Sequence, residues 1–200
     1  MSLVIVLATG AAVVEIPDGA YVIAADGGAD SGMRFDLAVG DFDSIHPETL
    51  DKLTNVEVYP PDKDATDLEL AMEAALRAGA TQLLVVGSDG GRLDHLFGSL
   101  VLLASDKWAG VEVDALLGDA RAHVVRGSRV LAGAVGETIS LFALGGPAGG
   151  VTTEGLVYPL AGETLEPGSS RGVSNLFHDT EARITVERGV VLAVRPSVVP

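Results

Sequence analysis

The sequence predicts an α/β domain followed by an all-β domain. In residues 1–119, short apolar runs alternate with segments of helical periodicity, which is typical of a mostly parallel sheet covered on both faces. In residues 120–200 the helical periodicity disappears, and short β-type runs are separated by Gly, Pro and Thr. We therefore expect a mostly parallel α/β domain over residues 1–119 and an antiparallel β-sandwich over residues 120–200.

Six short runs predict the strands of the first domain, and the first, second and fifth of them are expected to be buried. In chain order they are Leu3–Ala8, Tyr21–Ala25, Leu37–Val39, Val56–Tyr59, Gln82–Val86 and Val111–Leu117.

The clearest helical pattern begins at Ala65, after the fourth predicted strand, and Gly79 is expected to end that helix. A second long helix is expected over Leu93–Lys107, and shorter helices over Ala29–Phe35 and His46–Leu53. The apolar residues of the first helix recur at i, i+3, i+4, i+7 and i+8, as Leu68, Ala71, Met72, Ala75 and Leu76.

The second domain contains four clear β-type runs. The last two, Arg183–Glu187 and Val190–Val194, are separated by Arg188 and Gly189, which predicts a β-hairpin with Ile184 and Val186 on one face. The other two runs are Ala122–Val125 and Thr138–Leu144.

The composition excludes several classes of protein. The chain has no Cys, which removes disulfides, thiolate metal sites and Cys nucleophiles and is consistent with a reducing cytoplasm. No run approaches the roughly 20 apolar residues of a membrane span, and the apolar start, Met1–Val14, lacks the basic segment of a signal peptide. The net charge of −15 argues against nucleic acid as a partner. We expect a cytoplasmic protein that binds neither nucleic acid nor membrane, with Trp108 used for packing.

The acidic residues are concentrated in the first domain. Residues 1–119 carry 15 Asp and 6 Glu against 3 Lys and 3 Arg, a net charge of −15, whereas residues 120–200 are neutral overall. Asp is a poor former of helices and strands, so folding propensity does not account for its abundance there. The asymmetry supports a boundary near residues 118–120 and indicates that the first domain handles cations.

The segment Leu37–Ile45, L-A-V-G-D-F-D-S-I, brings two carboxylates to the end of a predicted strand. Only Phe42 separates Asp41 from Asp43, and residues two apart in an extended segment point to the same side. Two neighbouring carboxylates repel each other unless a cation lies between them, and oxygen ligands suit magnesium or calcium. A solvated Asp turn is the alternative for this segment taken alone.

Polar groups follow four consecutive predicted strands at the same edge of the sheet. Ligands of open α/β sheets bind beyond the carboxyl ends of the strands, so we expect these groups to form one ligand site. They are Asp26 after the second strand, Asp41 and Asp43 after the third, Asp62, Asp64 and Asp67 after the fourth, and Asp89, Arg92 and Asp94 after the fifth.

Two parts of this set have alternative explanations. Asp64 could be the N-cap of the following helix, with Asp67 favourably placed in its first turn. The segment Gly87–Arg92, G-S-D-G-G-R, could be a plain strand-to-helix turn, although its Gly amides and Arg92 suit phosphate. It matches neither the P-loop nor the dinucleotide-binding pattern. His95 is assigned no ligand role.

Carboxylates, glycine amides and an Arg at one edge together predict a site for a polyphosphate with magnesium. Phosphoryl-type transfer depends on positioning and charge neutralisation, so a missing Ser/His or Cys/His pair is no objection. The first domain is therefore expected to bind a nucleotide.

Six motifs continue this pattern along nearly the whole chain. In the first domain they are A-D-G-G-A-D (25–30), V-G-D-F-D-S-I (39–45), D-K-D-A-T-D (62–67) and G-G-R-L-D-H (90–95). In the second they are V-T-T-E-G-L-V-Y-P-L (151–160) and G-S-S-R-G-V-S-N (168–175). In order and spacing they resemble the motifs of the thiamin pyrophosphokinase family.

The resemblance implies transfer of pyrophosphate from ATP to the hydroxyethyl group of thiamin, giving thiamin diphosphate and AMP. It implies a catalytic domain over residues 1–119 that binds ATP and magnesium, and a thiamin-binding and dimerisation domain over residues 120–200. It further implies a homodimer with thiamin bound where the subunits meet.

The resemblance also implies roles for residues at matching positions. Asp41, Asp43 and Asp67 would hold magnesium, with Asp26 close by. Asp94 would orient or deprotonate the thiamin hydroxyl, and Ser174 and Asn175 would lie against thiamin. Gly172, in the same segment, is assigned no contact with the substrate. The nucleotide site is expected to include Asp64, Thr66, Gly87, Gly90, Gly91 and Arg92. The expected catalytic set is Asp26, Asp41, Asp43, Asp67, Arg92 and Asp94.

Two positions depart from the family pattern, and three rival functions stay open. Tyr158 stands where the family often has Trp, and the loop Ala8–Ala11 lacks the Gly-Gly-Asp type of sequence expected after the first strand. The rivals are a pyrophosphokinase for another hydroxymethyl compound such as a pterin, a magnesium-dependent phosphohydrolase, and a non-catalytic nucleotide sensor. The motifs of the second domain favour thiamin over a pterin, and a sensor would tolerate loss of Asp94.

Overall fold

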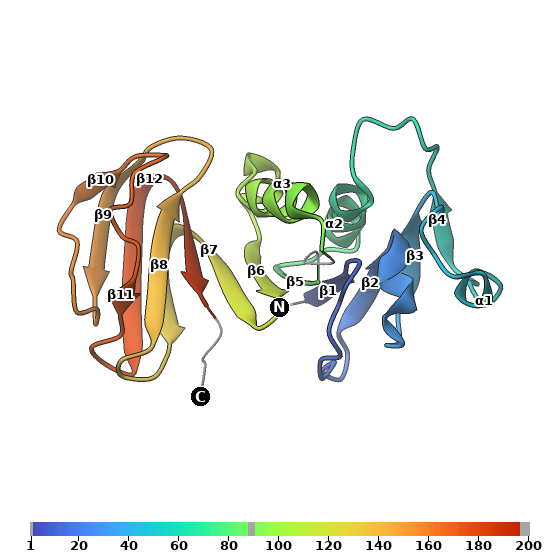
Figure 1. Ribbon diagram of the computed structural model, residues 1–200, viewed down its shortest axis with the longest axis horizontal. Helices are drawn as coiled ribbons and strands as arrows, with labels where there is room; N and C mark the ends of the chain where they lie inside the picture. The colour runs from blue at the N-terminus through green and yellow to red at the C-terminus, as the bar shows by residue number, and fades with distance from the viewer. Residues whose placement is uncertain (1, 88–90, 197–200) are drawn as a thin grey trace. The chain divides into compact units, whose positions relative to one another are not determined.

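The structure is a computed structural model that describes residues 2–87 and 91–196 (Figure 1). The chain divides into two compact units, residues 1–102 with 110–118 and residues 103–109 with 119–200. The sequence predicts a single boundary after residue 119, whereas the short segment 103–109 groups with the second unit.

A parallel sheet forms the centre of the first unit. Its strands lie in the order β6-β5-β1-β2-β3-β4, and each described pairing between neighbours is parallel, as the sequence predicts. Successive strands step away from β1 in one direction as far as β4, and β5 then returns to the other side of β1. The strands are β1 (Leu3–Leu7), β2 (Tyr21–Ala25), β3 (Leu37–Gly40), β4 (Val56–Val58), β5 (Gln82–Val86) and β6 (Glu112–Leu117).

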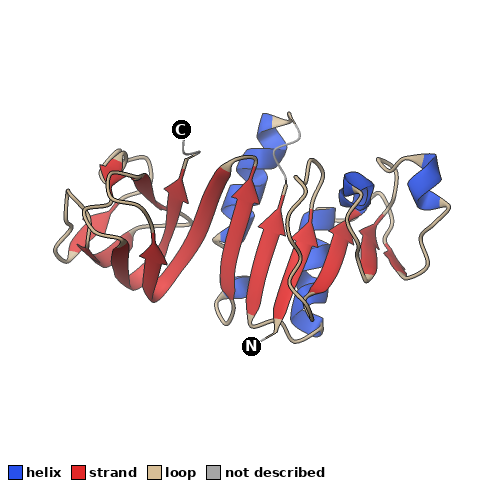
Figure 2. Cartoon of the chain, turned by 90° about the horizontal axis from the view of Figure 1, so that it is seen from below, coloured by secondary structure: helices blue, strands red, loops and turns tan. Residues whose placement is uncertain are grey.

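Helix α2 (Asp67–Arg77) packs against β1, β2 and β3 through its apolar face, so the helical pattern in the sequence is confirmed. Its buried residues include Leu68, Ala71 and Met72, and Gly79, with φ 81°, follows its C-terminal end. Figures 1 and 2 show α2 and α3 (Leu93–Leu103) on the same face of the sheet.

The opposite face of the sheet is covered by loops. Ile5 and Leu7 of β1 and Val22 of β2 pack there in an apolar cluster. The loop between β1 and β2 and the segment before β3 supply Ala11, Val14, Ile16, Met33 and Phe35 to this cluster. Both faces of β1, β2 and β3 are therefore buried, which explains why these strands are apolar without alternation. The edge strand β4 is exposed, with Val58 69% exposed.

Three of the predicted helices differ from the structure. The expected helix over Ala29–Phe35 is wrong, because the chain instead forms a 3-10 helix, η1 (Asp26–Ser31), that begins directly after β2 and ends at Gly32 with φ 75°. Helix α1 (Pro47–Leu50) is shorter than predicted. The second long helix also ends early, at Leu103, because Ser105 has ψ 140° and caps the short 3-10 helix η2 (Asp106–Trp108).

The second unit is rich in β-structure and is organised around its last strand. β12 pairs antiparallel with β7 along most of its length, with β9 through its first half and with β8 through its second half. Two short strands extend the pairing, β10 on β9 and β11 on β8. The strands are β7 (Ala120–Ala132), β8 (Thr138–Ala143), β9 (Ala148–Glu154), β10 (Glu163–Leu165), β11 (Asn175–Leu176) and β12 (Glu181–Arg195).

The hairpin predicted at Arg188 and Gly189 is wrong. Residues 181–195 form one strand whose pairing with β7 shifts register between Val186 and Val191, so the Gly lies in a bulge rather than a turn. A side chain at Gly189 would also approach the carbonyl oxygen of Pro147 to 2.5 Å. The predicted common face of Ile184 and Val186 is confirmed, since both are buried.

The core of the second unit includes the fully buried Phe177 and residues of all its longer strands. Trp108 is 1% exposed, so its predicted use in packing is confirmed. Among the described residues, no helix is long and apolar enough to cross a membrane.

Candidate active site

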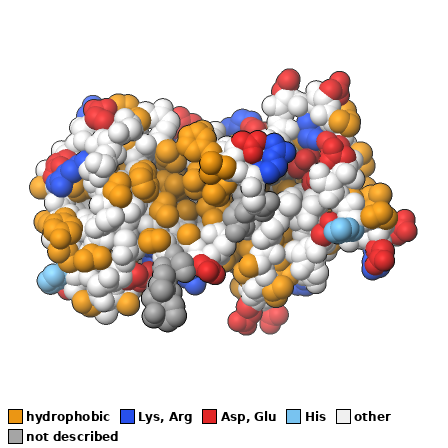
Figure 3. Space-filling model, viewed as in Figure 1, with side chains coloured by type: hydrophobic (Ala, Val, Ile, Leu, Met, Phe, Trp, Pro, Cys, Tyr) orange, Lys and Arg blue, Asp and Glu red, His pale blue; other side chains and the backbone are white. Residues whose placement is uncertain are grey.

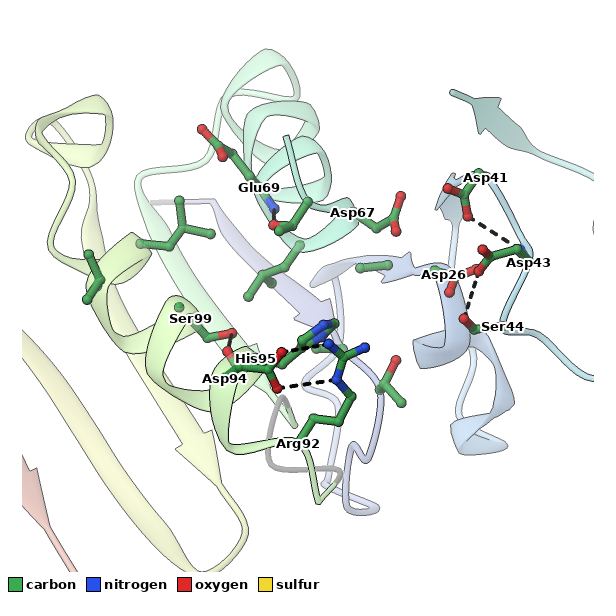
Figure 4. A pocket seen from close by; sticks show the side chains of 18 residues that line it. Asp26, Asp41, Asp43, Ser44, Asp67, Glu69, Arg92, Asp94, His95 and Ser99 are labelled. Atoms are coloured by element: carbon green, nitrogen blue, oxygen red, sulfur yellow. Dashed lines mark hydrogen bonds and ion pairs between the residues drawn. The ribbon is translucent and has the colours of Figure 1, made fainter. Parts of the chain in front are cut away.

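A pocket of about 670 Å³ lies at the carboxyl edge of the parallel sheet in the first unit (Figure 4). The residues that follow β1, β2 and β3 meet there with the beginnings of α2 and α3. The described residues that line it are Ala8, Thr9, Ala25, Asp26, Asp41, Asp43, Ser44, Thr66, Asp67, Leu68, Glu69, Arg92, Asp94, His95, Gly98, Ser99, Val101 and Leu102. Of the polar groups predicted after separate strands, the pocket brings together six, namely Asp26, Asp41, Asp43, Asp67, Arg92 and Asp94. Asp62 and Asp64 are exposed and are not among the described lining residues, and Asp89 lies outside the described residues. The loop after β1 contributes Ala8 and Thr9.

Asp26 is the most deeply buried acid of the pocket. Its side chain follows β2 directly, only 7% of the residue is exposed, and its Oδ1 has no hydrogen-bond partner among the described residues. Burial, together with the charges of Asp67, Asp41 and Asp43, raises the pKa of Asp26, although a hydrogen bond from the backbone of Gly27 opposes this. A buried carboxylate oxygen that has no hydrogen-bond partner is suited to bind a cation.

The turn after β3 brings Asp41 and Asp43 together, by a geometry that differs from the predicted one. Phe42 has a φ of 60°, so the segment is a left-handed turn and not an extended strand. The backbone amide of Asp43 donates to Asp41 Oδ1 over 3.4 Å, and Ser44 Oγ donates to Asp43 Oδ1 over 2.7 Å. The two carboxylates therefore share one side of the chain because of the turn.

Three carboxylates of the pocket meet closely enough to share a cation. One oxygen each from Asp26, Asp41 and Asp43 lies within 4.8 Å of the other two. Only oxygen ligands are offered, which suits a hard divalent ion such as magnesium. The structure thus places Asp26 in the group that the sequence predicts from Asp41, Asp43 and Asp67, while Asp67 points toward that group from the start of α2 (Figure 4).

Gly40 makes the close approach of these acids possible. A β-carbon at this position would lie 3.1 Å from Asp67 Oδ1 and 3.1 Å from the β-carbon of Asp26, and its φ of 156° is outside the region that other residues favour. The last residue of β3 must therefore be small where the neighbouring carboxylates converge.

Lys63 contacts two of the acids that line the pocket, a contact that the sequence does not predict. Its Nζ lies 2.5 Å from Asp41 Oδ2 and 3.1 Å from Asp67 Oδ1. The hydrogen bond from Lys63 lowers the pKa of Asp41. Burial by itself would lower the pKa of Lys63, but its contacts with Asp41 and Asp67 outweigh burial and raise it. The available signal was a single cation inside the acidic run D-K-D-A-T-D.

Arg92 and Asp94 form an ion pair on the other side of the pocket (Figure 4). Arg92 Nε and Nη2 donate to Asp94 Oδ1 and Oδ2 over 3.3 and 2.6 Å, and both side chains are largely exposed. The hydrogen bond from Arg92 lowers the pKa of Asp94 to about 2. In this arrangement Asp94 is a weak proton acceptor, and Nε and Nη2 of the Arg92 guanidinium are already hydrogen-bonded to Asp94.

Only some of the predicted phosphate-binding residues line the pocket. Thr66 lines the pocket and is the N-cap of α2, where its Oγ1 accepts from the amide of Glu69 over 3.2 Å. The alternative role of Asp64 as N-cap is therefore wrong, and Asp64 is exposed outside the described lining.

The glycines after β5 also differ from the expectation. The amide of Gly87 donates to the carbonyl of Leu116, and its φ of 100° allows it to pack against the loop after β1. Gly91 is exposed and is not among the described lining residues. Gly90 lies outside the described residues.

The second unit has a smaller pocket, of about 440 Å³, around the predicted thiamin-contacting residues. Ser174 lines it in a left-handed conformation with φ 58° and donates its amide to Ser140 Oγ. Asn175 is buried, and its side-chain amide accepts from the backbone N–H of Tyr158 and donates to the carbonyl of the same residue. Asn175 therefore positions Tyr158, whose side chain is exposed at the pocket.

Gly172 also lines this smaller pocket, although the sequence analysis assigns it no contact with the substrate. Its carbonyl accepts from the backbone N–H of Leu141 in β8 over 2.9 Å, and its φ is 97°. A β-carbon at this position would lie 2.8 Å from the carbonyl oxygen of Leu141. Gly172 therefore allows the wall of the pocket to pack closely against β8, and the absence of a substrate contact stays a prediction.

The charge asymmetry of the sequence is visible on the surface. Figure 3 shows acidic side chains at several separate places on this face of the first unit. The acids that line the described pocket are therefore one part of the excess of Asp in residues 1–119.

Two family models match the chain. The model described as thiamin pyrophosphokinase, catalytic domain, matches residues 15–113, and the model described as thiamin pyrophosphokinase, vitamin B1 binding domain, matches residues 124–191. Together they cover most of the chain and all of the predicted site residues.

Individual relatives point to the same family. The chain is 26% identical over 174 residues to the thiamine pyrophosphokinase of Bacillus subtilis (strain 168), an alignment that covers 83% of this chain and 80% of the relative. It is 26% identical over 182 residues to thiamine pyrophosphokinase 1 of Oryza sativa subsp. japonica, covering 81% of this chain and 67% of the relative.

Solved structures share the fold. The crystal structure of thiamine pyrophosphokinase from Bacillus subtilis matches with a TM-score of 0.85 at 21% identity, covering 99% of this chain and 100% of that chain. Thiamin pyrophosphokinase from Candida albicans matches with a TM-score of 0.75 at 15% identity, covering 96% and 89%. At these identities the likeness shows the fold, which combines an α/β sheet with a second unit rich in β-structure.

Replacing Asp26 with Asn should stabilise the chain when divalent ions are removed. Because its pKa is raised in the folded chain, the free energy of unfolding falls as pH rises from about 3.9, the pKa of an unfolded Asp, through the raised value. Asn does not ionise, so its free energy of unfolding does not fall with pH in this way, and Asn tolerates the φ of 42° at position 26. We expect thermal melts in EDTA at pH 7–8 to show a higher Tm for Asp26→Asn than for the wild-type chain. The rise should be about 2–4 °C for each kcal/mol gained in the free energy of unfolding.

The matched control is Asp18→Asn, at an exposed position in the turn before β2, which should leave Tm unchanged. A lower Tm for Asp26→Asn than for the wild-type chain at pH 7–8 would contradict the assigned cost of burying this charge.

Proposed function

The chain belongs to the thiamin pyrophosphokinase family, and we propose that its acidic pocket binds ATP with magnesium for transfer to thiamin. Its function is that of a thiamin pyrophosphokinase, a transferase. The observation that carries the proposal is the convergence of Asp26, Asp41 and Asp43 at the carboxyl edge of the sheet, in a pocket large enough for a nucleotide.

The donors present fit a magnesium ion. Asp41, Asp43 and Asp67 would hold it. Asp26 supplies a buried oxygen that has no hydrogen-bond partner among the described residues and lies close to oxygens of Asp41 and Asp43. When bound, the ion would neutralise charge on the phosphate oxygens of ATP. The Thr66 hydroxyl accepts from Glu69 and retains its own hydrogen, which it can donate to a phosphate oxygen.

We assign Arg92 to the phosphates and Asp94 to the thiamin hydroxyl. Arg92 donates two hydrogen bonds to Asp94 in the structure. The guanidinium of Arg92 must therefore leave Asp94 and bind the phosphates of ATP before Asp94 can accept a proton. The hydroxyl oxygen of thiamin then bonds to the β-phosphorus, the bond from that phosphorus to the α,β-bridging oxygen breaks, and AMP leaves. The hydroxyl proton passes to the carboxylate of Asp94.

The second unit would receive the thiamin ring. Its pocket presents the exposed ring of Tyr158, and the buried amide of Asn175 holds the backbone at that position. An aromatic face suits a flat cationic ring, and the acidic character of the chain also favours a cation. Ser174 is the remaining predicted contact. We propose a homodimer with thiamin bound where the subunits meet.

A product assay tests the function directly. Purified protein with ATP, magnesium and thiamin should produce AMP and thiamin diphosphate in equal amounts. ADP, or free pyrophosphate with thiamin unchanged, would show that the pocket handles a nucleotide but that the acceptor is wrong.

In the same assay, Asp43→Asn should lose activity and magnesium-dependent ATP binding while its circular dichroism remains that of the wild-type chain. The loss follows from removing one charged ligand of three carboxylates that meet. Asp18→Asn, which removes an exposed carboxylate of the same unit, should retain activity. Unchanged turnover of Asp43→Asn would remove Asp43 from the metal site.

Arg92→Lys should lower kcat/KM about 10-fold or more, because a single ammonium cannot reproduce the planar fork of Arg on phosphate oxygens. Steady-state kinetics over a range of ATP concentrations measures this loss. Arg77→Lys is the control, since Arg77 pairs with Glu57 at the far end of α2. Wild-type kinetics for Arg92→Lys would rule out a bidentate phosphate contact.

Light scattering at micromolar concentration should give the mass of two 20.5 kDa chains. A second copy would cover the apolar stripe of α3, where Leu93, Phe97 and Val101 are exposed at positions i, i+4 and i+8. Phe97→Asp should shift the mass toward one chain, whereas Val13→Asp, at another exposed apolar position, should not. A monomeric wild-type chain would count against a shared thiamin site.

A further inference from the structure

Lys63 contacts two of the carboxylates that the proposed function assigns to magnesium. Its ammonium lies 2.5 Å from Asp41 Oδ2 and 3.1 Å from Asp67 Oδ1, and these acids come from different elements, the turn after β3 and the start of α2. A single cation therefore bridges two of the predicted ligands.

This contact is built into the fold and is not a loose surface pair. The side chain of Lys63 is 11% exposed and that of Asp41 is 9% exposed. Removing an ammonium from water is costly unless carboxylates compensate for the lost hydration. Here Asp41 accepts a hydrogen bond from Lys63, and Asp67 adds an opposite charge 3.1 Å away. The neighbouring acids in the chain, Asp62 and Asp64, are exposed, so Lys63 is turned inward while they are not.

An ammonium and a divalent ion cannot share these oxygens equally. Magnesium needs its ligand oxygens at about 2.0–2.1 Å, and the ammonium already lies against one oxygen of Asp41 and one of Asp67. Two cations on one carboxylate pair also repel each other. An incoming triphosphate offers the ammonium other oxygens, and this exchange would release both carboxylates to the metal.

We propose that Lys63 is a positioning residue that competes with magnesium for Asp41 and Asp67, so that the pocket binds the free ion weakly and binds it well only together with nucleotide. The inference rests on the proposed function, because it takes these acids as metal ligands. The opposite arrangement, in which Lys63 holds the carboxylates ready for the metal, predicts an effect of the opposite sign. By linkage, the coupling between metal and nucleotide must be reciprocal.

The test measures binding of Mn²⁺ to the full chain by calorimetry, first alone and then with an ATP analogue that has a methylene bridge between the α- and β-phosphates. Lys63→Met keeps the length of the side chain and removes its charge. We expect it to bind free Mn²⁺ about 10-fold more tightly than the wild-type chain, since one nearby like charge is gone. We also expect the analogue to improve Mn²⁺ affinity less in this variant.

Three variants separate competition from a general effect of charge or packing. Lys63→Arg keeps the cation and should bind free Mn²⁺ as weakly as the wild-type chain. Lys52→Met removes a cation from an exposed position of the same unit and should leave Mn²⁺ affinity unchanged. Lys63→Gln is uncharged but keeps a hydrogen-bond donor, and it should resemble Lys63→Met.

If Lys63→Met unfolds without metal, its Mn²⁺ affinity is obtained from the rise of Tm with Mn²⁺ concentration. Unchanged or weaker binding of free Mn²⁺ by Lys63→Met and Lys63→Gln would overturn the inference. Failure of the proposed metal site is distinguishable from this, because the wild-type chain would then bind no Mn²⁺ even with the analogue. Loss of Mn²⁺ binding in Asp43→Asn, without a gain in Lys63→Met, would remove the role of Lys63 alone.

Discussion

Repulsion among carboxylates is the constraint on which the functional part of this chain depends. Asp26, Asp41 and Asp43 place oxygens within 4.8 Å of one another, and the raised pKa of Asp26 shows that burial and neighbouring charges make its ionised form costly. Such a cluster does not form by itself in a flexible chain. It is held by a parallel sheet whose strands β1, β2 and β3 are buried on both faces and whose strands end at one edge.

The backbone conformation at this edge also allows the carboxylates to approach one another. Asp26 and Phe42 have positive φ, which few residues other than Gly adopt. Asp26 begins η1 directly after β2, and Phe42 lies in the turn after β3. Gly40 leaves space where Asp26 and Asp67 approach each other. Lys63, whose side chain is 11% exposed, then offsets part of the repulsion. The third positive φ outside Gly among the described residues is that of Ser174, in the pocket of the second unit.

Regular elements and site residues were predictable from the sequence to different degrees. The strands Tyr21–Ala25 and Gln82–Val86 and the apolar face of α2 follow directly from local pattern, because buried strands and helices impose their own periodicity. Local pattern was misleading at Gly189, where a bulge in a long strand has the same residues as a hairpin turn. The 3-10 helix that begins at Asp26 was missed for a similar reason, since six residues carry too little periodicity.

The sequence by itself determined the two-part organisation, the acidic character of the first part and the family, because these depend on composition and on motifs within short segments. Only the tertiary structure decided which groups touch. It placed Asp26 with Asp41 and Asp43 and paired Arg92 with Asp94. It also hydrogen-bonded the side chain of Asn175 to the backbone of Tyr158 and brought Lys63 into contact with Asp41. Such pairings join residues from separate segments, so their distances and burial depend on the packed sheet and not on local spacing.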